Sequence, residues 1–122
     1  MKISKNNAEH YIWGNICDGW HLVKTEELSI IHEKMPPQTS EVRHFHEQAK
    51  QFFFILSGQA TLEVNSEIIL LNKYEGLEIL TNTPHQMMNN SKAPIEFIVI
   101  SKPSSKGDRV LVKEQAVKVL AD

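Results

Sequence analysis

The stretch RHFHEQAKQFFFILSG, residues 43–58, contains the clearest strand signal of the chain and the first sign of a functional site. Its last eight residues form an aromatic and aliphatic run closed by a glycine, which is typical of a β-strand. Just before this run, His44 and His46 stand two positions apart in another strand-like segment. Alternate residues of a strand point to the same side, so both imidazoles project from one face, about 7 Å apart. That spacing lets both bind one metal ion, because metal–imidazole bonds are about 2.0–2.1 Å long.

Two further segments can bring ligands to the same place. If the chain turns at residues 49–50, Gln51 begins the neighbouring strand and its amide oxygen can point at the same spot. Downstream, His85 starts another predicted strand, and the same face of that strand carries Met87 and Asn89. Closing a barrel would bring His85 beside the first pair. The combined set would be three imidazoles and one amide oxygen.

The same residues have simpler interpretations when each is taken alone. A His-x-His pair on a strand more often belongs to a solvated face than to a metal site. The single histidines His10, His21 and His32 lie among polar or turn residues, and we assign them no role. The three phenylalanines, residues 52–54, are core residues by default because large aromatic side chains dominate buried area.

Short strand-like segments separated by turn signals run through the rest of the chain. Residues 60–64 (ATLEV) alternate apolar and polar side chains, and residues 95–101 (IEFIVIS) form the last clear strand. At least seven such segments, with hardly a helical period among them, predict one all-β domain over residues 1–122, built as a sandwich or barrel. Only KEQAVKVLAD, residues 113–122, could form a short helix.

Composition excludes several classes of partner. The chain has 13 basic and 15 acidic residues among 122, a net charge of −2, so we expect no binding to nucleic acid or to an anionic membrane surface. No apolar run approaches the ~20 residues of a transmembrane helix, and the N-terminal residues lack the apolar core of a signal peptide. The single cysteine, Cys17, cannot form an internal disulfide. We therefore expect a cytoplasmic protein.

The order of these residues resembles the cupin superfamily. Its first motif has His-x-His, then an acidic residue, then a glycine; its second has a glycine, a Pro-x-Gly turn, a histidine and an asparagine. In this chain the matching residues are His44, His46, Gln51, Gly58, Gly76, His85 and Asn89. Asn82 stands near the turn glycine, and asparagine tolerates the left-handed backbone that glycine usually supplies. The resemblance covers about residues 28–101 and implies a double-stranded β-helix, a jelly-roll barrel.

The resemblance also implies a metal site. Its ligands would be His44, His46, His85 and Gln51, and its occupant one divalent transition metal per chain, which could be Zn, Ni, Fe, Mn or Cu. Gln51 replaces the family's usual glutamate, so it offers an oxygen but no negative charge. We therefore expect weaker metal binding and a more positive centre, which favours anionic ligands and Lewis-acid chemistry. Substrate-pocket residues by the same resemblance are Phe53, Met87 and Asn89.

Three functions stay open. The first is a metal-dependent enzyme, of oxygenase or isomerase type, acting on a small organic molecule that is preferably anionic. The second is a metal-containing protein that binds a small molecule or sugar without turnover, and the third is a degenerate cupin with a structural role. Catalytic residues are not identified, although Glu33 and Glu78 could move protons if the strand register turns them inward. Glu47 should lie on the opposite face from His46, in solvent.

Finally, the resemblance implies a homodimer. Family members commonly pair through an exposed sheet or an exchanged N-terminal strand. The strand after Gln51 is apolar on both sides, with Phe53 and Ile55 on one side and Phe52 and Phe54 on the other, as expected if a partner covers its outer face. Candidate interface residues near the N-terminus are Tyr11, Ile12, Trp13 and Trp20.

Overall fold

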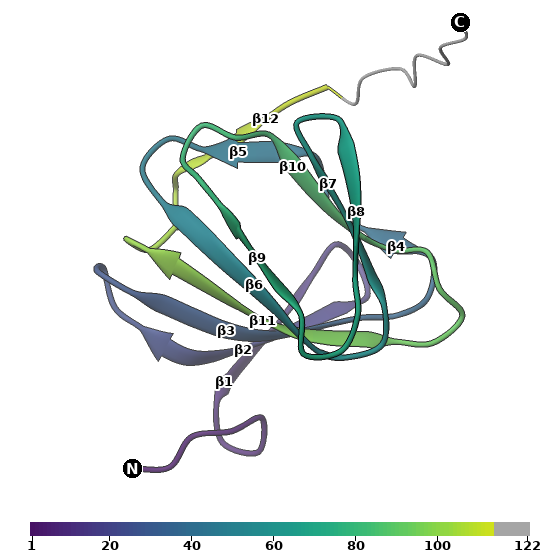
Figure 1. Ribbon diagram of the computed structural model, residues 1–122. Helices are drawn as coiled ribbons and strands as arrows, with labels where there is room; N and C mark the ends of the chain where they lie inside the picture. The colour runs from purple at the N-terminus through teal and green to yellow at the C-terminus, as the bar shows by residue number, and fades with distance from the viewer. Residues whose placement is uncertain (114–122) are drawn as a thin grey trace, which may run out of the picture.

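Figure 1 shows the computed structural model, which describes residues 1–113. Over these residues the chain forms twelve β-strands in two antiparallel sheets and no helix, so the all-β prediction is confirmed. The helix expected at residues 113–122 lies outside the described part apart from Lys113, which is not helical. No membrane-spanning helix is found in the described part of the chain.

The first sheet contains six strands, and strands far apart in the sequence lie side by side in it (Figure 1). Their order is β1 (Glu9–Trp13), β2 (Cys17–Lys24), β3 (Ser29–Met35), β11 (Ile95–Lys102), β6 (Lys50–Ser57) and β9 (Gly76–Ile79). The late strand β11 thus separates β3 from β6, pairing with both along its length.

The second sheet lies across from the first (Figure 1). Its order is β12 (Arg109–Leu111), β5 (His44–His46), β10 (His85–Asn89), β7 (Ala60–Val64) and β8 (Glu67–Leu71), and β4 (Thr39–Ser40) also pairs with β10. Two facing antiparallel sheets with these crossovers make the expected jelly-roll barrel.

The core lies between the sheets, where inward side chains meet. In β6, Phe53 and Ile55 are buried while Phe52 is 38% exposed, which is the alternation expected from the sequence. On β11, Ile95, Phe97 and Val99 repeat the pattern on the same side. Burial of these apolar faces is the main driving force that closes the barrel.

The turn before β10 is built as the sequence suggests. Asn82 has a φ of 59°, the left-handed conformation that asparagine tolerates. Its backbone N–H donates to the carbonyl of His46 at 2.7 Å. This bond fixes the turn that leads into His85 against the end of β5, and so holds the two histidine-bearing strands in register.

Two of the four expected interface residues point inward instead. Tyr11 and Trp13 line the barrel pocket, because alternate residues of β1 share one face and that face turns toward the interior. Ile12, on the opposite face of β1, is 56% exposed, and Trp20 is half-buried. The sequence marked β1 as apolar but did not show which of its faces is covered.

Candidate metal centre

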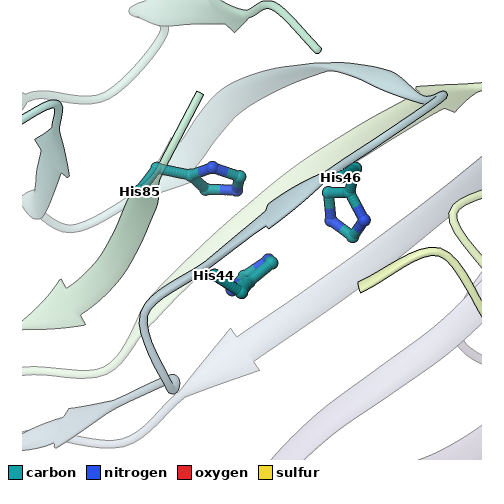
Figure 2. Close-up of side chains that lie close together, drawn as sticks. All are labelled: His44, His46 and His85. Atoms are coloured by element: carbon teal, nitrogen blue, oxygen red, sulfur yellow. The ribbon is translucent and has the colours of Figure 1, made fainter. Parts of the chain in front are cut away.

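Three buried histidines converge from two neighbouring strands of the second sheet. His44 and His46 come from β5 and His85 from β10, and His85 is the direct cross-strand partner of His44. Figure 2 shows the three rings together; their centroids are 4.5 Å apart for His44–His85, 4.9 Å for His44–His46 and 5.9 Å for His46–His85. One ring nitrogen from each lies within 4.8 Å of the others. The three histidines are therefore positioned to hold a metal ion.

Two of the rings are oriented by their own strands. His44 Nδ1 donates to the carbonyl of Val42 at 2.7 Å, and His85 Nδ1 donates to the carbonyl of Thr83 at 2.9 Å. A proton fixed on Nδ1 leaves the lone pair on Nε2, which is the usual arrangement of a metal-binding histidine. His85 Nε2 is buried and has no hydrogen-bond partner among the described residues.

The histidines are held in the neutral form that binds metals. Desolvation by burial, aided by the neighbouring His85, lowers the pKa of His44 to about 3. The same two causes lower the pKa of His46 to about 4. Burial also lowers the pKa of His85. At neutral pH each of the three imidazoles is therefore uncharged and keeps a lone pair on one ring nitrogen.

Gln51 reaches the site from the opposite wall. The sequence suggested that Gln51 lies on the strand next to the one with His44 and His46. Instead, it lies on β6 of the first sheet, across the barrel from β5. Its Nε2 donates to the hydroxyl of Ser101, its cross-strand partner on β11, at 2.9 Å. Its Oε1 is buried with no hydrogen-bond partner among the described residues. A buried carbonyl oxygen left unpaired costs about 1–3 kcal/mol, so this oxygen is suited to a ligand that is not part of the chain.

A cavity of about 300 Å³ lies beside two of the histidines and Gln51, while His85 is not among its lining residues. Its walls include His44, His46, Gln51 and Phe53, and Phe53 therefore lies where the sequence placed it. The three neutral imidazoles fit a divalent metal, and the cavity beside His44 and His46 leaves an open volume for a small molecule, with Gln51 on its wall.

The other two expected pocket residues do not line this cavity. Met87 is 1% exposed and packs in the apolar core. Asn89 is fully buried, and its amide nitrogen donates to the carbonyls of Met35 and Ala93, both at 2.9 Å. Its Oδ1 accepts from the backbone N–H of Ser91 at 3.0 Å. These hydrogen bonds use both the amide nitrogen and the oxygen of Asn89 to hold the loop after β10, so Asn89 supports the strand that carries His85.

Two glutamates line the cavity. Burial raises the pKa of Glu33 to about 7, partly opposed by a 3.2 Å hydrogen bond from the Tyr11 hydroxyl. Burial also raises the pKa of Glu41 to about 8, partly opposed by the backbone N–H of Met87, which donates at 2.9 Å. Glu78 is exposed on β9, 3.7 Å from Lys50. Of the two candidates from the sequence, only Glu33 therefore faces the site.

Glu41 and Arg109 also line the cavity and were missed from the sequence. Glu41 lies between two very short strands, and Arg109 follows the last clear apolar run, so neither sits in a pattern that predicts a face. Only the proximity of Glu41 to His44 in the sequence could have suggested it. Glu47 is exposed, as expected.

Asp108 is a further residue that sequence reasoning missed. Its carboxylate accepts the backbone N–H groups of Glu47, Gln48 and Ala49 at 2.9–3.2 Å. Although desolvation acts to raise the pKa of Asp108, these bonds outweigh it and keep the pKa below its usual value. The turn they hold connects His46 on one sheet to Gln51 on the other, so Asp108 fixes the segment between these two residues.

The sequence matches a known family over the part that carries the site. The family model described as Cupin domain matches residues 31–101, which include all three histidines and Gln51. A search of curated proteins finds no match.

Solved structures share the fold at low sequence identity. KdgF from Halomonas sp. is 15% identical with a TM-score of 0.76, over 83% of this chain and 91% of that one. A predicted oxalate decarboxylase from Thermotoga maritima is 16% identical with a TM-score of 0.78, over 85% and 100%. The polyketide cyclase RemF from Streptomyces resistomycificus is 16% identical with a TM-score of 0.78, over 97% and 90%. At these identities the likeness shows the jelly-roll fold alone.

Proposed function

The chain belongs to the cupin domain family, and from this premise we propose that it is a metal-dependent enzyme acting on a small organic molecule in the barrel pocket. One observation carries the proposal: three buried neutral imidazoles lie together, and two of them, His44 and His46, line one cavity with Gln51, whose buried side-chain oxygen has no partner among the described residues. We propose that these four side chains hold one divalent transition metal per chain. Such an ion, when bound, polarises a substrate oxygen and supplies positive charge where negative charge develops.

The charges around the cavity favour an anionic or oxygen-rich substrate. None of the four proposed ligands is negative, so they leave the charge of a dication uncompensated. Arg109 adds a further positive charge to the cavity wall. A carboxylate or a group that becomes negative during reaction would be stabilised there.

The cavity favours proton transfer over oxygenation. Glu33 and Glu41 line it, and burial holds the pKa of each near neutrality, where a group both gives and accepts protons. We therefore propose an isomerase type of reaction. A second candidate, a metal-containing binding protein without turnover, is supported by Gln51, since the missing negative charge weakens the hold on the metal.

We also propose that the protein is a homodimer in the cytoplasm. The outer face of the first sheet carries a row of apolar side chains, with Phe52 and Phe54 stacked at 6.2 Å and Ile98 and Ile100 directly beside them on β11. A second copy of the chain would cover this face. The buried free thiol of Cys17 suits a reducing compartment.

Metal analysis tests the proposed function. Protein purified without a histidine tag and dialysed against zinc should retain about one ion per chain, and His85→Ala should lose it. The matched control is His10→Ala, because His10 is exposed on β1 and paired with Asp18, far from the triad in the sheet order. Wild-type protein that retains no metal, or an H85A variant that retains it fully, would contradict the proposal.

A further inference from the structure

Three residues form a continuous row across the first three strands. Tyr11 on β1 pairs with Gly19 on β2, and Gly19 pairs with Glu33 on β3. Residues paired in this way share one face of a sheet. Here it is the face toward the barrel interior, because both Tyr11 and Glu33 line the cavity of the histidines.

Gly19 makes contact across this row possible. A Cβ atom built on Gly19 would lie 2.6 Å from the Tyr11 hydroxyl oxygen and 2.5 Å from ring atom Cε1, far inside normal contact distance. The Tyr11 ring therefore lies across β2, over the one residue that has no side chain there. In this position its hydroxyl reaches past β2 and donates to Glu33 Oε2 at 3.2 Å.

The hydrogen bonds of the two cavity glutamates differ. The Glu41 carboxylate is attached to the strand backbone through the N–H of Met87. Glu33 receives its hydrogen bond from a side chain, through Oε2, and in both glutamates Oε1 receives none from the described residues. Glu33 thus presents one oxygen to the cavity while Tyr11 fixes the other.

Tyr11 also borders a second cavity. Besides the cavity of about 300 Å³, it lines one of about 770 Å³, whose walls include His21, Lys24 and Lys106. Tyr11 therefore borders both cavities, and Glu33 borders the smaller one.

We infer that Glu33 is the residue that transfers a proton to and from the substrate, that Tyr11 is its positioning residue, and that the substrate is a carbon acid, with a C–H bond next to a carbonyl group. This inference rests on the proposed function. The Glu33 carboxylate takes the proton, and the electron pair of the C–H bond moves toward the carbonyl oxygen. The same carboxyl then returns a proton to carbon, so Glu33 ends as it began and no oxidant is needed. The near-neutral pKa of Glu33 suits this exchange.

Hydrogen–deuterium exchange tests the step. Zinc-loaded protein in D2O is mixed separately with dihydroxyacetone, pyruvate and hydroxypyruvate, and loss of the C–H signal is followed by NMR. At least one probe should exchange ten or more times faster with wild-type protein than with Glu33→Gln, since acid–base catalysis contributes about 10²–10⁴-fold. Glu78→Gln, an exposed glutamate of the same sheet, is the matched control and should keep the wild-type rate. The inference is overturned if wild-type protein exchanges none of the three probes, or if E33Q exchanges them as fast as wild type.

Titration of the metal-free protein tests the positioning role. The groups facing Glu33 across the cavity are Tyr11, Glu41, His44, His46 and Arg109. Because the Tyr11 hydroxyl lowers the pKa of Glu33, Tyr11→Phe should raise it, measured by NMR of ¹³C-labelled glutamate with E33Q to assign the signal. Gly19→Ala, which displaces the ring, should raise it in the same direction. An unchanged pKa in Y11F overturns the positioning role even if G19A fails to fold. Wild-type protein that binds no zinc overturns the proposed function instead, which separates the two failures.

Discussion

Gln51 is the residue on which the chemistry of the site depends most. Its amide nitrogen donates to Ser101, and its oxygen is buried with no hydrogen-bond partner among the described residues. A glutamine held in this way is a neutral oxygen donor with a fixed orientation. We therefore expect Gln51 to preserve the metal site, with one more unit of positive charge than a glutamate at this position would leave.

Replacing Gln51 with glutamate should tighten metal binding. Gln51→Glu places an anionic oxygen beside three imidazoles, and we expect the dissociation constant for zinc to fall at least tenfold, about 1.4 kcal/mol, measured by competition with a chelator. Gln59→Glu is the matched control, because it adds the same charge at an exposed turn. Equal affinity in Q51E and wild type would show that residue 51 does not bind the metal.

Glu41 should make the metal-free protein less stable as the pH rises. Its pKa is about 8 in the folded protein, against an ordinary value of 4.5. Between these values the folded state binds more protons than the unfolded state, so the free energy of unfolding falls by about 1.4 kcal/mol per pH unit. Lowered histidine pKa values act in the opposite sense below pH ~6.5. The comparison of Glu41→Gln with wild type removes their contribution.

The expected result is a gain that depends on pH. The unfolding free energy of E41Q minus that of wild type should increase by about 4 kcal/mol at most from pH 5 to pH 8. Urea unfolding of the metal-free proteins at both pH values measures this difference. Glu47→Gln, an exposed glutamate, is the control. The same difference from wild type at both pH values would show that the Glu41 carboxyl is solvated when folded.

At the scale of elements, the turn between β5 and β6 joins the two sheets of the metal site. Asp108→Ala removes the acceptor of three backbone N–H groups in this turn, and we expect a loss of about 2 kcal/mol in unfolding free energy. The distance between His46 and Gln51 is then no longer fixed, so zinc affinity should fall as well. Asp108→Asn keeps one acceptor oxygen, so its unfolding free energy and zinc affinity should lie between those of wild type and D108A. If D108A bound zinc as tightly as wild type, the turn would not position the ligands.

The sequence predicted the individual strands better than it predicted which strands pair with each other. Strands such as β6 and β11 alternate apolar and polar or small positions, and the period of two gives their faces directly. That period does not say which sheet a strand joins, so Gln51 was expected beside β5 and lies across from it. The same limit applies to β1, where Tyr11 faces the pocket although its apolar neighbours suggested an interface.

The site was predictable where one pattern held several residues together. The three histidines could be grouped because their spacing matches a family motif. Glu41 and Arg109 could not, because they reach the cavity through short segments whose direction depends on pairings with β10 and β5. Asn89 fits the motif, yet its bonds to Met35 and Ala93 give it a structural role. A motif position thus does not distinguish a ligand from the residue that supports its strand.

At the scale of the whole molecule, the apolar outer face of the first sheet predicts a dimer. Light scattering should give about twice the chain mass of 14.0 kDa. Phe52→Asp places a charge within the apolar row of that face and should give monomers. Ile68→Asp is the matched control, because Ile68 is an exposed apolar residue on β8 of the other sheet. A monomeric wild type, or a dimer that dissociates in I68D alone, would contradict this arrangement.

The whole barrel brings two sheets together around the histidines, and we propose that four side chains from both sheets form one metal site. X-ray absorption at the zinc edge, on protein loaded with one equivalent of zinc, tests it most directly. The spectrum should contain three imidazole nitrogens at about 2.0–2.1 Å and at least one oxygen, and H85A should reduce the imidazole count by one or bind no zinc. A wild-type spectrum with fewer than three imidazoles would contradict the account.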